Sequence, residues 1–171
     1  MKGEQTMEYK TLEIRGAKIM SGGFRHFAKG KYGYSFCIDL TEGNEVTFGG
    51  KKIIDPNELI KELEDDMWIV QYTRPSSDAY EPTPFLQVKI NFDNKFNPPY
   101  IVVNGVTYDE STVSALQDAR YSHVDVAVNP ARPTERRDGS LKRTAYLGSL
   151  HVDLAEDGDY VPERYADPFA K

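Results

Sequence analysis

The sequence predicts a mainly β domain, in which short strands form a five-stranded Greek-key barrel with one or two short helices and extra hairpins. Three observations predict this class. Apolar and polar residues alternate in several short segments, turn signals separate these segments, and only two stretches have helical character. With 171 residues, the chain is long enough to bury one hydrophobic core and is expected to form a single domain.

The first two predicted strands flank a basic loop. The apolar alternation of residues 12–19 changes phase at Gly16, and a glycine at such a change predicts a β-bulge that bends a long first strand. Residues 21–33 are rich in glycine and lysine and predict a loop. Residues 32–38 alternate cleanly and predict a second strand, with Tyr32, Tyr34 and Phe36 toward the core.

Residues 55–72 predict a helix followed by a strand. Asp55 suits the N-cap and Pro56 the first helical position, and Leu59 and Leu63 fall on one face. Residues 67–72 then read as a strand, whose buried face includes either Trp68 or its neighbour.

The second half of the chain predicts further strands. Residues 86–92 alternate, residues 100–108 form a hairpin around Asn104-Gly105, and residues 109–119 form a short helix. Residues 124–128 and 143–154 predict two strands that a basic loop separates, and Tyr146 shares its phase with core positions.

The order of these elements is that of an OB-fold, whose strand faces and first and fourth loops bind oligonucleotides. Residues 1–155 are therefore predicted to form an OB-fold-like nucleic-acid-binding domain, and residues 156–171 an acidic C-terminal tail. An unrelated β-sandwich with the same number of strands is the competing fold.

The composition argues against a disulfide, a metal, a cofactor and catalysis. Cys37 is the one cysteine, and three histidines do not complete a thiolate zinc site. Ser149 and His151 lack a convergent acid, and no nucleotide-binding or metalloprotease motif occurs. Because there is neither a signal-peptide pattern nor an apolar run long enough to cross a bilayer, a cytoplasmic protein without a membrane partner is expected.

Positive charge is concentrated in two segments although the net charge is −6. Residues 15–38 contain five basic residues and no acidic residue, and residues 128–150 contain five basic residues against two acidic ones. A binding surface depends on local charge, so these segments predict contacts with phosphates along a single strand. The candidate nucleic-acid-binding residues are Phe24, Arg25, Phe27, Lys29, Lys31, Lys89, Arg132, Arg136, Arg137, Lys142 and Arg143. Phe24 and Phe27 are predicted either to stack on bases or to fill one end of the barrel.

Short motifs along most of the chain add a family resemblance. They are Phe24-Arg25-x-Phe27, KYGYSF at 31–36, FLQVKI at 85–90, PPYIV at 98–102, HVDVAV at 123–128, TAYL at 144–147 and YADPF at 165–169. In this succession the chain resembles bacteriophage single-stranded DNA-binding proteins. The resemblance implies an OB-fold that coats single-stranded DNA in phage replication or recombination, in the cytoplasm of a bacterial host.

The resemblance also implies a role for the tail. Tyr165, Asp167 and Phe169 resemble the acidic, phenylalanine-containing ends by which such proteins bind replication or recombination partners. Homo-oligomerisation is compatible with the sequence. The alternative function is that of a phage structural or assembly protein, whose basic loops bind protein and not DNA.

Overall fold

The computed structural model describes residues 9–20, 27, 29–30, 33–43, 45–73, 82–117 and 119–155. Within these residues the helical elements are α1 (Pro56–Asp65) and a short 3₁₀ helix, η1 (Val113–Leu116). The strands in chain order are β1 (Leu12–Arg15), β2 (Lys18–Ile19), β3 (Lys29–Gly30), β4 (Gly33–Asp39), β5 (Glu45–Phe48), β6 (Lys51–Ile53), β7 (Gln71–Tyr72), β8 (Pro84–Ile90), β9 (Tyr100–Val103), β10 (Val106–Tyr108), β11 (Tyr121–Pro130), β12 (Thr134–Glu135), β13 (Leu141–Lys142) and β14 (Ala145–Leu154).

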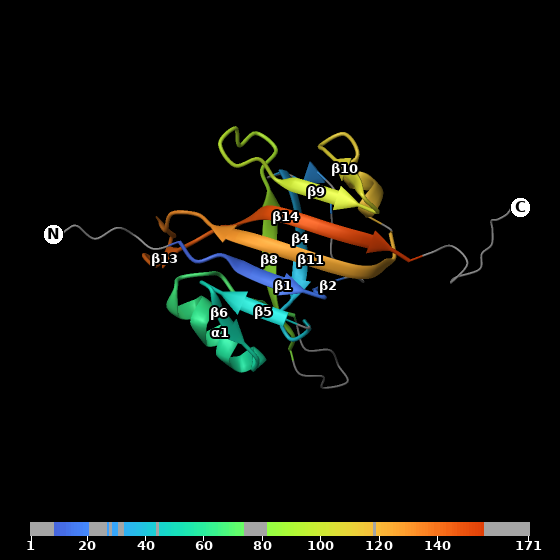
Figure 1. The fold of residues 1–171 in the computed structure, drawn as a ribbon. Coiled ribbons are helices and arrows are strands. Elements are labelled where there is room, and N and C mark those ends of the chain that lie inside the picture. The colour runs from blue at the N-terminus through green and yellow to red at the C-terminus, as the bar shows by residue number, and fades with distance from the viewer. Residues whose placement is uncertain are drawn as a thin grey trace, which may run out of the picture.

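One sheet of twelve strands contains most of these elements. Its neighbours follow the order β2-β4-β8-β14-β11-β1-β5-β6, with β3, β7, β9 and β10 attached to members of that path. Figure 1 shows β14, β11 and β1 in one layer, with β4 and β8 running across behind them. The large apolar core draws its side chains from both layers, among them Phe36 and Val88 behind and Val126 and Leu150 in front.

The phase change at Gly16 is confirmed. Leu12 and Ile14 are buried in β1, whereas Ala17 and Ile19 are buried after the glycine, which has a φ of 72°. A positive φ costs glycine little, so the chain can bend here without strain. The two parts then have different partners, because β1 pairs with β11 and β5 while β2 pairs with β4.

The helix predicted after Asp55 is confirmed as α1. The Asp55 carboxylate accepts a hydrogen bond from the backbone N–H of Asn57 at 2.9 Å, and Pro56 occupies the first turn. Leu59 and Leu63 are buried against the core. Figure 1 shows α1 beside β5 and β6, at one end of the molecule.

Trp68, and not Ile69, faces the core after α1. Its side chain is 1 % exposed, packs edge-on against Phe48, and donates from Nε1 to Asp66 at 3.0 Å. The predicted strand at 67–72 shortens to β7, and Met67 at its expected start has a φ of 72°, outside the extended region.

The hairpin at Asn104-Gly105 is confirmed by the pairing of β9 with β10. Both turn residues have positive φ, 49° and 81°, as a two-residue hairpin turn requires. The helix predicted at 109–119 is only the 3₁₀ turn η1. Asp109 opens that turn, since its carbonyl accepts from Val113 N at 2.9 Å and its carboxylate from Ser111 N at 2.9 Å.

The prediction of a mainly β domain is confirmed, but the strand count is not. The main sheet has twelve strands in an open order, where five in a closed barrel were predicted. The additional strands come from short hairpins at the edges. β5 and β6 extend the sheet beyond β1, and β9 and β10 extend it beside β14.

A candidate nucleic-acid interface

The outward face of β4 and β8 carries polar side chains next to the basic segments. Along β8, Gln87 and Lys89 alternate with the buried Leu86, Val88 and Ile90. Opposite them on β4, Ser35 pairs in register with Lys89. The Gln87 amide Nε2 donates to the Ser35 hydroxyl at 3.3 Å, so these side chains lie on one surface.

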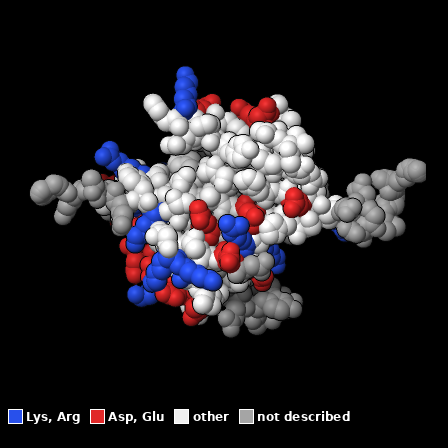
Figure 2. All heavy atoms as spheres, in the orientation of Figure 1, with Lys and Arg blue, Asp and Glu red and all other residues white. Residues whose placement is uncertain are grey.

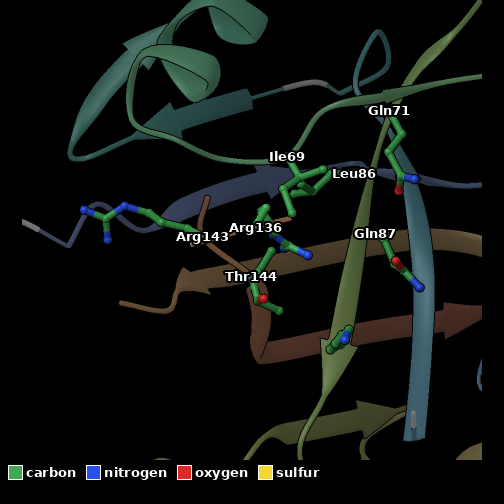
Figure 3. A pocket seen from close by; sticks show the side chains of 9 residues that line it. Ile69, Gln71, Leu86, Gln87, Arg136, Arg143 and Thr144 are labelled. Atoms are coloured by element: carbon green, nitrogen blue, oxygen red, sulfur yellow. The ribbon is translucent and has the colours of Figure 1, made fainter. Parts of the chain in front are cut away.

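A pocket of about 220 Å³ opens beside this surface, and we call it the Gln87 pocket. It lies where β8 changes neighbours, because β8 pairs with β7 at Phe85 and with β14 at Lys89. Its lining consists of Ile69, Gln71, Leu86, Gln87, Lys89, Arg136, Arg143, Thr144 and Ala145. In Figure 3, Arg136 lies between Ile69 and Thr144 with its guanidinium directed toward β8.

A second hollow, of about 250 Å³, adjoins the Gln87 pocket at Lys89, which lines both. We call the two together the β8 groove. Lys29 and the rings of Tyr34, Phe92 and Tyr146 line this second part, with the acids Asp93 and Glu110. The phase predicted for Tyr146 was wrong, because Ala145 and Leu147 on either side of it are buried and its ring therefore faces outward.

The other half of the outward face is covered. Met20, Cys37 and Phe85 form a small apolar cluster there, and Met20 N donates to Cys37 O at 2.9 Å. Burial raises the pKa of the Cys37 thiol to about 11, so the thiol is neutral at pH 7. The groove is therefore bounded on this side by apolar packing.

The arginine hairpin, residues 131–143, contributes Arg136 and Arg143 to the lining of the Gln87 pocket. β12 pairs with β13, and Gly139 has a φ of 85° in the turn between them. Arg136 N donates to Ser140 O at 2.8 Å, and the Asp138 carboxylate accepts from the Ser140 hydroxyl at 2.6 Å. The latter bond lowers the pKa of Asp138. The turn thus has an ordered backbone, although its side chains are exposed.

The exposed cations of the hairpin are Arg132, Arg136 and Arg137. None of the three makes an ion pair with another described residue. Lys142 is half-buried in β13. Positive charge on the hairpin is therefore available to an external anion.

Arg143 is also a predicted nucleic-acid-binding residue, but unlike Arg132, Arg136 and Arg137 it is buried. Its side chain is 2 % exposed, and its Nε donates to Asp66 O at 3.0 Å. One terminal nitrogen donates to Ala131 O at 3.2 Å, and the Asp66 carboxylate lies 3.7 Å from Nε. Arg143 N also donates to Met67 O at 2.8 Å. These bonds fix the base of the hairpin to the end of α1, and Figure 3 shows the guanidinium pointing away from the Gln87 pocket.

Phe27 is a core residue, which decides between its two predicted roles. Its ring is 0 % exposed and stacks on Phe36, with ring centroids 4.9 Å apart. Its N–H donates to Ser35 O at 2.8 Å, and its φ is 57°. A ring without exposed surface cannot stack on a base in this conformation. Lys29, by contrast, is exposed in β3.

The other predicted residues lie outside the described part of the chain. They are Phe24, Arg25, Lys31, Tyr32, Tyr165, Asp167 and Phe169.

Sequence reasoning missed several residues that line the groove. Gln87 could have been found from the sequence, because it is a polar residue in a strand whose apolar and polar residues alternate. The sequence gives no such indication for Ile69, Gln71 and Thr144. They reach the pocket only because β7 and β14 pair with β8.

The opposite face of the molecule, as far as its residues are described, lacks a comparable basic surface. Figure 2 shows the face of β9, β14, β11 and β1 as mostly uncharged, with acidic and basic side chains intermingled near α1. Arg15 on this face pairs with Glu45 at 3.3 Å, and His123 Nε2 lies 2.8 Å from Asp125. These side chains thus have partners within the protein.

Comparison with protein-family models, with characterised proteins and with solved structures finds no match for this chain. Among the described residues, no three His, Cys, Asp or Glu side chains form a group suited to a metal ion. No helix in the described part of the chain is long and apolar enough to cross a membrane.

Proposed function

We propose that the protein binds single-stranded DNA along the β8 groove, without a chemical reaction of its own. One observation carries the proposal. Lys89 lines both of the adjoining hollows, with Lys29 in the lining of one and Arg136 of the hairpin in the lining of the other. Cations that follow a groove suit a phosphate backbone, and the exposed sides of Tyr34 and Tyr146 offer rings to bases.

The strand connectivity supports an OB-type domain. β1 and β2 are separated only by Gly16 and Ala17, and they pair with β11 and β4 respectively. Between them the order is β4, β8, β14, β11, with β8 parallel to β14. Taken as one bent first strand, β1 and β2 would bring the ends of this order together, as in a Greek-key barrel of five strands. In OB-folds the strand faces and the first and fourth loops bind oligonucleotides, and the hollows on β8 lie beside the arginine hairpin, which stands at the place of the fourth loop.

The resemblance to phage proteins gives the proposal its biological setting. In that setting the protein coats transient single strands during replication or recombination, and the acidic tail contacts other replication proteins.

The test is a fluorescence titration with oligo-dT at several salt concentrations. Binding is expected to weaken with salt, with log K falling by about 0.7 per phosphate neutralised for each unit of log salt. Duplex DNA of the same length is expected to bind more weakly, because bases in a duplex cannot reach the tyrosines. Undetectable binding at low salt, or preference for duplex, would contradict the proposal and favour a protein-binding role.

A matched pair of variants locates the surface. Arg136→Ala with Arg137→Ala should weaken oligo-dT binding and lower the salt slope by about 0.7 for each phosphate that the variant no longer neutralises. Lys52→Ala with Lys61→Ala removes the same charge near α1 and should leave affinity almost unchanged. If both pairs weaken binding equally, then net charge and not the groove attracts DNA.

A further inference from the structure

The Gln87 pocket has a mixture of groups that a phosphate backbone does not need. A phosphate offers only acceptors, so cations and N–H groups suffice to bind it. The pocket adds the side chains of Gln71 and Gln87, each with an acceptor oxygen, and the hydroxyl of Thr144. Ile69 and Leu86 contribute apolar surface. The lining is therefore mainly polar, with apolar patches at Ile69 and Leu86 against which a planar ring can pack.

We infer that the Gln87 pocket binds one guanine base turned out of the strand in the β8 groove, with Arg136 and Gln87 contacting its polar edges. The inference rests on the proposed binding of single-stranded DNA. It adds that binding has a base preference at one position, whereas the rest of the groove tolerates any sequence.

Arg136 supplies the donor side of this site. A guanidinium offers parallel N–H groups that match two adjacent acceptors. Guanine presents such a pair at O6 and N7, and an unpaired cytosine presents one at O2 and N3 but has a single ring and therefore less surface to pack against Ile69 and Leu86. The Arg136 side chain is exposed and makes no ion pair with another described residue. Its guanidinium is directed toward β8 in Figure 3. Among the described residues, no carboxylate therefore competes with a base for this side chain.

Gln87 supplies the acceptor side. Its Nε2 already donates to Ser35 at 3.3 Å, which orients the amide and leaves Oε1 as the group available to a ligand. Guanine carries donors at N1 and N2, so one base satisfies both Gln87 and Arg136. Thymine lacks adjacent acceptors for the guanidinium, and adenine has a donor where guanine has O6.

The pocket is also positioned to take a base from a strand in the groove. It adjoins the second hollow at Lys89, where a phosphate can lie. Arg143 holds the hairpin against α1, so the backbone that carries Arg136 is fixed in place. Preorganisation of this kind favours selective contacts, because little order has to be gained on binding.

The experiment compares oligo-dT with the same oligonucleotide carrying one central dG, one dA or one 7-deaza-dG. The dG strand should bind roughly three- to tenfold more tightly than oligo-dT. A bidentate arginine contact discriminates by about fivefold or more, and the observed gain is smaller because only some registers place the dG in the pocket. The dA strand should show no gain. The 7-deaza strand lacks the N7 acceptor and should lose most of the gain.

Two variants of the same hairpin assign the effect. Arg136→Lys keeps the charge but loses the planar fork, so oligo-dT affinity should persist while the dG preference disappears. Arg137→Lys makes the same exchange at a residue that does not line the pocket and should keep the preference. Equal affinity for dT and dG strands, or equal gains from dG and dA, would overturn the guanine site and leave the groove proposal intact. Failure of every strand to bind would instead overturn the groove proposal itself.

Discussion

The two basic segments of the chain have different anchors but present their cations in the same way. In the first segment, the buried ring of Phe27 lies two residues before the exposed Lys29. In the second, the buried Arg143 holds the hairpin that carries the exposed Arg136. One anchor is apolar and stacks on Phe36, whereas the other is charged and binds carbonyl groups. Residue type alone therefore does not distinguish a buried anchor such as Arg143 from an exposed cation such as Arg136.

Replacing the apolar anchor, Phe27, should have the largest effect on the stability of the protein. Phe27→Ala removes a fully buried ring and should lower the free energy of unfolding by about 4 kcal/mol. Chemical denaturation measures this. Lys29→Ala is the control, with stability within about 0.5 kcal/mol of the original protein and weaker oligo-dT binding. A Phe27→Ala protein with unchanged stability and weakened DNA binding would show that the ring contacts DNA and is not an anchor.

Replacing the charged anchor, Arg143, should lower the stability by a smaller but still clear amount. Arg143→Ala leaves Asp66 O and Ala131 O without these donors and the Asp66 carboxylate without its cation. Breaking such a buried pair costs about 3 kcal/mol, and equilibrium unfolding in urea measures the loss.

Arg136→Ala is the matched control in the same hairpin and should change stability by less than about 0.5 kcal/mol. Equal stabilities of the two variants would contradict the anchor role of Arg143, whatever their DNA affinities.

Local patterns predicted the elements that local physics determines. The N-cap at Asp55, the Asn104-Gly105 turn and the phase change at Gly16 each depend on residues within one or two turns, and each is confirmed. The mainly β class follows from the same alternation.

Long-range pairing explains what the sequence did not predict. Tyr146 faces outward and Arg143 inward because of how β14 and its preceding loop lie against β8 and α1. Neither partner is near in sequence. The Gln87 pocket arises in the same way, since the separation of β7 from β14 along β8 creates it. The edge strands β5 and β6 escaped prediction because short charged segments have little periodicity.

The smallest expected effect concerns the turn that presents Arg136. The hydrogen bond from the Ser140 hydroxyl holds the pKa of Asp138 below 3.8, the ordinary value. The carboxylate therefore stabilises the folded turn at neutral pH, and this contribution is lost as the pH falls through the folded pKa.

An NMR titration of the Asp138 carboxyl should give a midpoint below 3.8, and Ser140→Ala should raise that midpoint toward the ordinary value because the main stabilising donor is gone. Asp109 provides an internal control, since Ser111 lowers its pKa in the same way at a distant turn. Its midpoint should not respond to Ser140→Ala. A midpoint of Asp138 that also stays unchanged would mean that the hydroxyl does not order the turn, and that Arg136 owes its position to the anchor at Arg143 alone.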